Sequence, residues 1–241
     1  MLEQEEQKLQ GETEPTVDTS NTECERSAWE KYRAPLFAMI AVAVLLVGVS
    51  AGGLLWRPLV PDEGRSQSTA TPTTTEPRDA SLPAWIDQQL IAYNGHARDG
   101  ELLQAVNNIV VHYVGNPGTS AQNNRDYFNQ PQTMVSSHFV VGLKGEVILC
   151  VPLREVSSAS NHRNKDTISI EVCHPDETGQ FNQATYRSVV RLCAWLCERY
   201  GLEATDVIRH HDVTGKYCPL YYVEHPEAWE QFIQDVADCK G

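Results

Sequence analysis

The sequence predicts an α/β fold for residues 84–241, on three observations. Short runs rich in β-branched residues end at turn signals, which is typical of strands. A longer segment places its apolar residues at helical spacing, so strand-like and helix-like segments share one stretch, as in the α/β class. About 160 residues are enough for one hydrophobic core, so we expect a single domain.

Four segments have the composition of strands. The first ends at a turn signal, Asn116-Pro117-Gly118, and Lys144-Gly145 predicts a tight hairpin between the second and the third. The predicted strands are residues 108–114, 138–143, 146–151 and 167–173.

One helix is predicted over residues 184–200. Its apolar side chains recur at spacings of three and four, and Gly201 follows as a stop signal. Cys193 and Cys197 lie one turn apart on this helix, where the geometry of a disulfide is hard to reach. We therefore expect both to be small buried side chains.

An uncharged block of 21 residues, 36–56, precedes the domain. At about 1.5 Å of helical rise per residue it spans roughly 30 Å, the thickness of the hydrocarbon core of a bilayer. Arg33 and Arg57 flank the block. We predict a single transmembrane helix over residues 34–56 that acts as a signal anchor. A signal peptide cleaved near Ala51 is the alternative.

The segments on either side of this block are polar. Residues 1–33 carry nine acidic and four basic residues, unlike the short basic start of a signal peptide, and are predicted to form a disordered acidic tail. Residues 57–83 hold five prolines and five threonines and are predicted to form a linker. Basic residues number three just before the block and two just after it, which favours a cytoplasmic N-terminus only slightly. An unknown cytoplasmic partner of the acidic tail is a further hypothesis.

The charge of the chain limits its partners. The formal net charge is −13 at pH 7, whereas binding to a phosphate backbone requires a basic surface. We therefore expect no nucleic-acid partner.

Histidine and cysteine residues carry the strongest chemical signal. Residues 209–219 contain two histidines, a lysine and a cysteine, and imidazole and thiolate are preferred ligands of zinc. His112 lies inside an apolar predicted strand, where an unpartnered imidazole is costly to bury. These residues alone leave two interpretations open: a metal site, or a polar turn and a core histidine.

Four segments of the domain form an ordered pattern. They are Ile109-Val110-Val111-His112-Tyr113, Ser136-Ser137-His138-Phe139-Val140-Val141-Gly142, Ser169-Ile170-Glu171, and His210-His211-Asp212-Val213 through Lys216 and Cys218-Pro219. The pattern resembles the zinc-dependent N-acetylmuramoyl-L-alanine amidases of the second type, which are related to phage amidases and peptidoglycan recognition proteins. The resemblance covers about residues 105–235. It implies a central mixed β-sheet flanked by helices.

The same resemblance implies a catalytic Zn²⁺ ion held by His112, His210 and Cys218, with a fourth position left for water. His211 is the alternative to His210, because neighbours on an extended segment point to opposite sides and only one can face the metal. Asp212 is a candidate for orienting an imidazole from outside the ligand set.

Two further residues are expected to take part in catalysis. Strand alternation puts Ile168 and Ile170 on one face and Ser169 and Glu171 on the other. The resemblance implies that Glu171 is the general base, and a surface charge is the alternative. Lys216 is expected to stabilise an oxyanion, against the alternative of an exposed loop lysine.

The sequence departs from the pattern at one position. Some phage members carry a catalytic tyrosine where this chain has Ser137, so that role is unfilled or moved. His138 is expected to pack in the core or to contact substrate. Weaker candidates for substrate contact are Arg125, Asn161, Arg163 and Asn164.

The function implied by the resemblance is hydrolysis of peptidoglycan, at the amide between N-acetylmuramic acid and L-alanine, by zinc-activated water. Two alternatives stay open: a sensor of the same fold that binds peptidoglycan without cutting it, and a zinc amidase for another amide of the wall. Because this polymer lies outside the cytoplasmic membrane, we expect a single-pass membrane protein with its N-terminus inside and its catalytic domain outside. A secreted enzyme, cleaved near Ala51, is the alternative.

Overall fold

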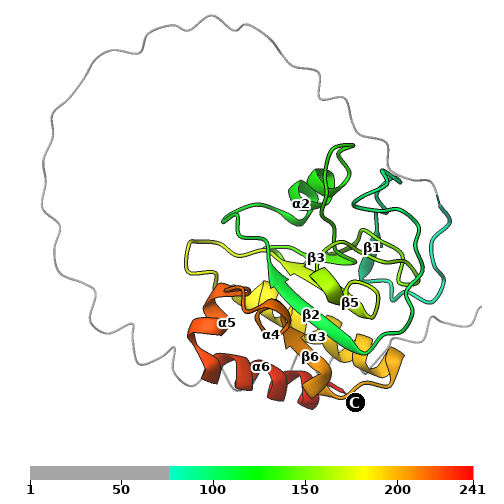
Figure 1. The fold of residues 1–241 in the computed structure, drawn as a ribbon. Coiled ribbons are helices and arrows are strands. Elements are labelled where there is room, and N and C mark those ends of the chain that lie inside the picture. The colour runs from blue at the N-terminus through cyan, green and yellow to red at the C-terminus, as the bar shows by residue number, and fades with distance from the viewer. Residues whose placement is uncertain (1–75, 241) are drawn as a thin grey trace, which may run out of the picture.

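The structure of the protein is a computed structural model that describes residues 76–240. The fold is a six-stranded sheet with helices on both faces (Figure 1). Among the strands of this part of the chain, only β3 and β4 pair in the antiparallel direction, so the sheet is mixed, as expected. In sheet order β1-β4-β3-β5-β2-β6, the strands are Ile86–Gln88, Val147–Leu149, Phe139–Val141, Thr167–Val172, Asn108–Tyr113 and Val207–Arg209.

The predicted acidic tail, residues 1–33, and the predicted transmembrane segment, residues 34–56, lie outside the described residues, as does the linker up to residue 75. Between residues 76 and 240, no helix is both long enough and apolar enough to cross a bilayer. The prediction of a membrane anchor therefore stays a prediction.

The four predicted strands are confirmed, with shorter bounds for each. The hairpin is also confirmed: Phe139 pairs with Leu149, and the Gly142 N–H donates to the Glu146 carbonyl oxygen (2.8 Å). The two edge strands, β1 and β6, are absent from the sequence prediction. Each has three residues that mix apolar and polar side chains, whereas β3 and β4 are equally short but wholly apolar.

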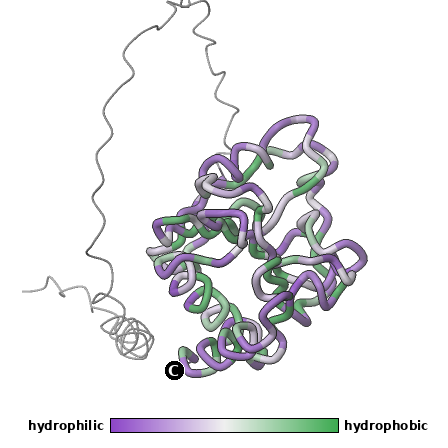
Figure 2. Tube along the Cα trace, turned by 90° about the vertical axis from the view of Figure 1, so that its left-hand side faces the viewer, coloured by the Kyte–Doolittle hydropathy of each residue, from purple (hydrophilic) through white to green (hydrophobic). Residues whose placement is uncertain are grey.

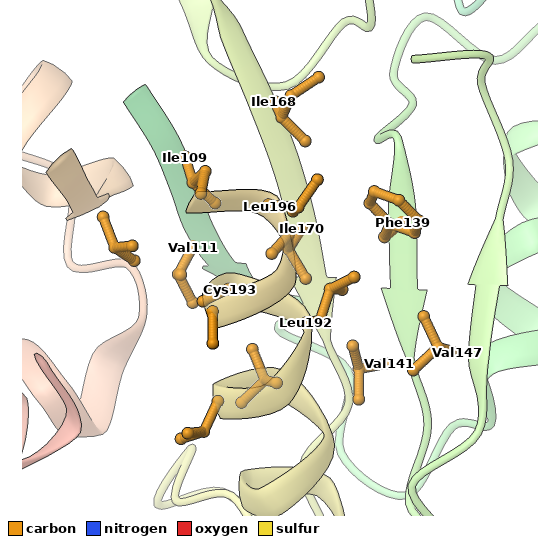
Figure 3. Packing of buried hydrophobic residues seen from close by; sticks show 14 of the residues in the cluster. Ile109, Val111, Phe139, Val141, Val147, Ile168, Ile170, Leu192, Cys193 and Leu196 are labelled. Atoms are coloured by element: carbon orange, nitrogen blue, oxygen red, sulfur yellow. The ribbon is translucent and has the colours of Figure 1, made fainter. Parts of the chain in front are cut away.

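One face of the sheet packs against α3 (Gln183–Tyr200). Figure 3 shows side chains of β2, β3 and β5 meeting Leu192, Cys193 and Leu196 of this helix. Because side chains alternate along a strand, His112 of β2 and Glu171 of β5 face the other side of the sheet. The predicted separation of apolar and polar faces in β5 is confirmed.

The ends of α3 follow from its sequence. The side chain of Asn182 accepts a hydrogen bond from the Thr185 N–H (3.0 Å) at the start, and Gly201 ends the helix with a φ of 66°, as predicted. Cys193 and Cys197 are buried and, within the described residues, form no disulfide. This confirms their prediction as small core side chains.

A second helix extends the layer behind the sheet, and a third covers the opposite face. On α6 (Pro226–Cys239), Phe232 lies 5.6 Å from the ring of Tyr186 on α3. On the opposite face α2 (Ala121–Phe128) buries Ala121 and Phe128. Figure 2 shows hydrophilic residues along the outer loops. The shorter elements are the 3₁₀ turns η1 (Asn161–Arg163) and η2 (Ala204–Asp206), and the helices α4 (His210–Thr214) and α5 (Leu220–Glu224).

The folded unit begins before residue 84. Residues 76–83 fall in the predicted linker, yet Leu82 is buried in the main core. The carboxylate of Glu76 accepts a hydrogen bond from Arg98 (2.7 Å), which is itself buried. Residues 76–83, predicted to belong to the linker, are therefore tied to the domain by apolar and charged side chains.

Candidate metal centre

Three neighbouring strands bring the candidate ligands to one edge of the sheet. Since β5, β2 and β6 are parallel, their carboxyl ends meet there. His112 lies near the end of β2, His210 begins α4 directly after β6, and Cys218 lies in the loop before α5. The ligand atoms of these three buried side chains all lie within 4.8 Å of one another.

The two imidazoles are held in the form that binds metals. Their ring centroids are 4.4 Å apart. Burial lowers the pKa of His112 well below its usual value, and the charges of His210 and Lys216 add to this effect. Burial and Lys216 lower the pKa of His210 as well. Both rings are therefore neutral near pH 7, as coordination requires.

Within the described residues, a buried ring nitrogen of His210 has no hydrogen-bond partner. The Nε2 atom of His210 donates to Asn161 Oδ1 (2.8 Å), whereas its Nδ1 atom is buried and has no hydrogen-bond partner within the described residues. The Nε2 atom of His112 lies 3.4 Å from Ser160 Oγ. Buried polar atoms are normally paired, so an orphaned nitrogen beside two further donors fits a metal ion.

The third donor, Cys218, is also buried. Burial raises the pKa of its thiol to about 12, Glu171 contributes to the rise, and a hydrogen bond from the backbone of Tyr113 opposes it. Its backbone is held by a hydrogen bond from the His211 N–H to the Cys218 carbonyl oxygen (2.9 Å). A buried thiol with so high a pKa becomes a thiolate near pH 7 only when a cation such as a metal ion binds it.

Glu171 lies next to the three donors. It pairs in register with His112 across β5 and β2, and its Oε1 atom is 4.0 Å from His112 Nδ1. Its Oε2 atom is buried and accepts no hydrogen bond from any residue between 76 and 240. Burial raises the pKa of Glu171 to about 8, and the charge of Lys216 opposes this rise. A carboxyl group that titrates near neutrality suits proton transfer.

Lys216 is exposed at the rim of the site, after Gly215 ends α4. Its positive charge lowers the pKa of Glu171 and of Cys218, so it lies near both. The structure thus brings together the three predicted ligands and the two predicted catalytic residues.

The structure corrects two expectations for the segment that follows His210. His210 and His211 begin a helix rather than lying on an extended strand, and only His210 joins the donor cluster. Successive residues on a helix still point in different directions, so His211 turns toward the Lys216 carbonyl oxygen (3.0 Å). Asp212 does not orient an imidazole of the cluster, because it pairs with Arg209 (2.7 Å).

Two expected substrate contacts are buried. His138 is fully buried, and its ring contacts Ser157 Oγ (3.0 Å) and the Glu155 carbonyl oxygen (2.9 Å), which supports packing over substrate contact. Arg125 is corrected: its buried guanidinium donates to the carbonyl oxygens of Gln89 and Leu90, so it ties α2 to the chain after β1.

Of the other candidates for substrate contact, Asn161 contacts the donor cluster, whereas Arg163 and Asn164 form their hydrogen bonds with residues outside that cluster. Asn161 contacts His210, as given above. Arg163 pairs with Asp166 (2.8 Å), and Asn164 Oδ1 accepts from the Ser160 N–H (2.6 Å). Ser137, at the tyrosine position of some relatives, is fully buried and donates to the Phe139 carbonyl oxygen (2.6 Å). Its hydroxyl therefore does not replace a phenol at the site.

Sequence reasoning missed the contacts of Ser160 and Asn161 with the two histidines. The sequence predicts no role for Ser160 and a substrate contact for Asn161. The histidines lie 48 and 49 residues from these partners along the chain, so spacing carries no signal of the contacts.

Comparisons with known proteins agree on one family. Residues 102–220 match the model of the family described as N-acetylmuramoyl-L-alanine amidase. The N-acetylmuramoyl-L-alanine amidase CwlL of Bacillus licheniformis is 32% identical over an alignment of 173 positions, and the match covers 65% of this chain and 48% of the relative. The N-acetylmuramoyl-L-alanine amidase BlyA of Bacillus subtilis is 32% identical over an alignment of 163 positions, and the match covers 59% of this chain and 44% of the relative. The chain thus spans about half the length of these curated relatives.

Solved structures show the same architecture. A mutant endolysin from Bacillus subtilis aligns with a TM-score of 0.55 and 25% identity, over 63% of this chain and 97% of that chain. The catalytic domain of XlyA aligns with the same TM-score and identity, over 63% of this chain and 98% of that chain. The matched part therefore corresponds to nearly all of each of these solved chains.

Proposed function

We propose that this chain is a zinc-dependent peptidoglycan hydrolase, because residues 102–220 match the model of the N-acetylmuramoyl-L-alanine amidase family. Its reaction is hydrolysis of the amide that joins N-acetylmuramic acid to the L-alanine of the stem peptide. The observation that carries the proposal is the convergence of His112, His210 and Cys218 within 4.8 Å, beside the carboxyl group of Glu171.

The donor set fits zinc better than other divalent metals. Two imidazoles and one thiolate are a combination that zinc prefers, and three protein ligands leave a coordination position for substrate or water. The Nδ1 atom of His210, which has no hydrogen-bond partner among residues 76–240, supports the same assignment. When bound, zinc supplies the Lewis acidity that polarises a carbonyl group and acidifies water.

The protein residues supply proton transfer and charge stabilisation. The Oε2 atom of Glu171, which has no hydrogen-bond partner in the described part of the chain, takes a proton from the attacking water and passes it to the leaving amine. The ammonium group of Lys216, exposed at the rim, stabilises negative charge that develops on the carbonyl oxygen.

The proposal includes a place of action. The uncharged segment 36–56 is long enough to anchor the chain in the cytoplasmic membrane, and peptidoglycan lies on the outer side of that membrane. The N-terminus is then inside and the catalytic domain outside. Cleavage near Ala51 would instead release the enzyme.

The test is a digestion of peptidoglycan by the purified full-length chain, loaded with zinc, followed by mass spectrometry of the released fragments. We expect free stem peptides that begin with L-alanine. Glu171→Gln should lower the rate about 10²- to 10⁴-fold because it removes the base, while zinc content stays unchanged. Glu177→Gln, an exposed glutamate outside the site, is the matched control and should cut at the wild-type rate.

Two outcomes contradict the proposal. Fragments cut within the stem peptide would show that a different amide is the substrate. Stem peptides that stay attached to the glycan, despite bound zinc and measurable binding of peptidoglycan, would show a sensor rather than a hydrolase.

A further inference from the structure

Two consecutive residues at the start of η1 contact the two histidines of the candidate metal centre. Ser160 Oγ lies 3.4 Å from His112 Nε2, and Asn161 Oδ1 lies 2.8 Å from His210 Nε2. Neither residue belongs to the elements that carry the histidines. The contact at Asn161 is the shorter and lies well within hydrogen-bond distance.

The chemistry of this contact determines which ring nitrogen of His210 carries the proton. An amide oxygen accepts hydrogen bonds and cannot donate them, so the proton is on Nε2. The lone pair is then on Nδ1, which is buried and meets no hydrogen-bond partner among residues 76–240. Nδ1 is thus the nitrogen left to bind a cation together with His112 and Cys218.

Asn161 makes the contact from an uncommon backbone conformation. Its φ is 55°, and no other residue except glycine has a positive φ in the described residues. Asn164 maintains this turn, because its Oδ1 atom accepts from the N–H groups of Ala159 (3.2 Å) and Ser160 (2.6 Å). A disfavoured conformation held by surrounding hydrogen bonds points to a functional constraint.

We infer that Asn161 is a positioning residue for the metal centre: its side-chain oxygen keeps His210 protonated at Nε2 and presents Nδ1 to the metal. The inference rests on the proposed zinc site. It gives Asn161 a protein partner in place of the substrate contact expected from the sequence. Hydrogen-bond partners of metal-bound histidines typically change metal affinity 10- to 100-fold, so the effect is measurable.

The experiment compares three substitutions in the purified full-length chain. Asn161→Gly removes the amide while glycine adopts the same φ without strain, so the fold is expected to keep or gain thermal stability in a chelator. Its Kd for zinc, measured by competition with a chromophoric chelator, should rise about 10- to 100-fold. Asn161→Asp keeps an acceptor oxygen and should bind zinc about as tightly as the wild type. Asn116→Gly, at an exposed asparagine, is the control and should leave the Kd unchanged.

A second readout observes the contact directly. The ring ¹⁵N shifts of the metal-free chain should show His210 protonated at Nε2 in the wild type and in Asn161→Asp, and a mixture of tautomers in Asn161→Gly. A wild-type Kd in Asn161→Gly would overturn the inference, and so would an equal loss in Asn161→Gly and Asn161→Asp. A wild type that binds no zinc would defeat the proposed function, and the ring spectrum would then decide alone whether Asn161 sets the tautomer.

Discussion

The Cys218 side chain is buried where its neutral form is favoured. Burial and the nearby Glu171 raise the pKa of the thiol to about 12. Only the thiolate is a good ligand or nucleophile, so the sulfur is inert near pH 7 unless a cation ionises it. The Cys218 sulfur lies within 4.8 Å of a ring nitrogen of each of two histidines, which is consistent with a metal centre.

Replacing Cys218 with alanine should abolish tight zinc binding, because two imidazoles alone leave the ion without its anionic ligand. We expect the zinc content of the purified variant, measured by mass spectrometry of the metal, to fall to background. The melting temperature of the variant should no longer respond to a chelator. Cys193→Ala removes a buried thiol from α3 instead and should keep its zinc. Retention of wild-type zinc by Cys218→Ala would show that Cys218 is not a ligand.

The buried His138 ring should make stability depend on pH. Burial lowers the pKa of His138 from 6.5 to about 4, so the folded state disfavours the proton that the unfolded chain accepts. The free energy of unfolding that depends on the neutral His138 ring is therefore fully present above pH 6.5 and is lost as the pH falls from 6.5 toward 4. The loss amounts to about 2 kcal/mol by pH 5. Urea unfolding in a chelator at pH 7.5 and pH 5 should show that His138→Asn loses about 2 kcal/mol less than the wild type over this interval. Identical losses in the two proteins would refute this role.

At the scale of elements, the sequence predicts those strands and helices whose apolar residues alternate or recur at helical spacing. The strand 167–173 and the helix 184–200 are both observed, because their patterns are long enough to be specific. On α6 the residues Trp229, Phe232 and Val236 also recur at helical spacing after Pro226, so this helix was predictable although it was not predicted.

Some features of the candidate site can likewise be predicted from the sequence, and others cannot. Its ligands follow from family motifs in the sequence, and the facing of Glu171 follows from strand alternation. The contact between Asn161 and His210 joins residues 49 positions apart through a backbone with positive φ, and neither feature has a local sequence signature. Tertiary packing alone places the two side chains together.

One buried arginine joins three segments of the domain. Arg98 donates to Glu155 (2.7 Å), to Glu76 (2.7 Å) and to the Ile91 carbonyl oxygen (2.8 Å). Its side chain is fully buried, and that of Glu155 is nearly so. This network holds residue 76, the segment after β1 and the loop after β4 together.

Replacing Arg98 with methionine should destabilise the domain by about 3–5 kcal/mol, because the buried Glu155 would lose its buried charged partner. Urea unfolding monitored by tryptophan fluorescence measures the change. Arg154→Met is the matched control: this arginine also lies near Glu155 (3.6 Å), but its side chain is 69% exposed, so the loss should be below about 1 kcal/mol. Equal losses in the two variants would contradict this account.

At the scale of the whole molecule, the main core and the candidate metal centre lie on opposite faces of the sheet. One face carries the main apolar core with α3 and α6, whereas Glu171 and His112 project from the other face at the edge where β5, β2 and β6 end. Changes at the metal centre therefore touch few of the residues that stabilise the fold. This separation lets the substitutions proposed above be judged by metal binding and activity rather than by unfolding.

The proposed topology makes a prediction for the full-length chain carrying an epitope tag at its N-terminus. Because residues 36–56 hold no charge over a length that spans a bilayer, the chain should sediment with membranes in high salt and dissolve only in detergent. Trypsin added to intact spheroplasts should degrade the domain of residues 76–240 and leave the tag protected inside. Deletion of residues 34–56 should move the protein to the soluble fraction. Loss of the tag from mature protein whose N-terminus lies near Ala51 would instead establish a secreted enzyme, since an anchor that is cut off cannot retain the domain.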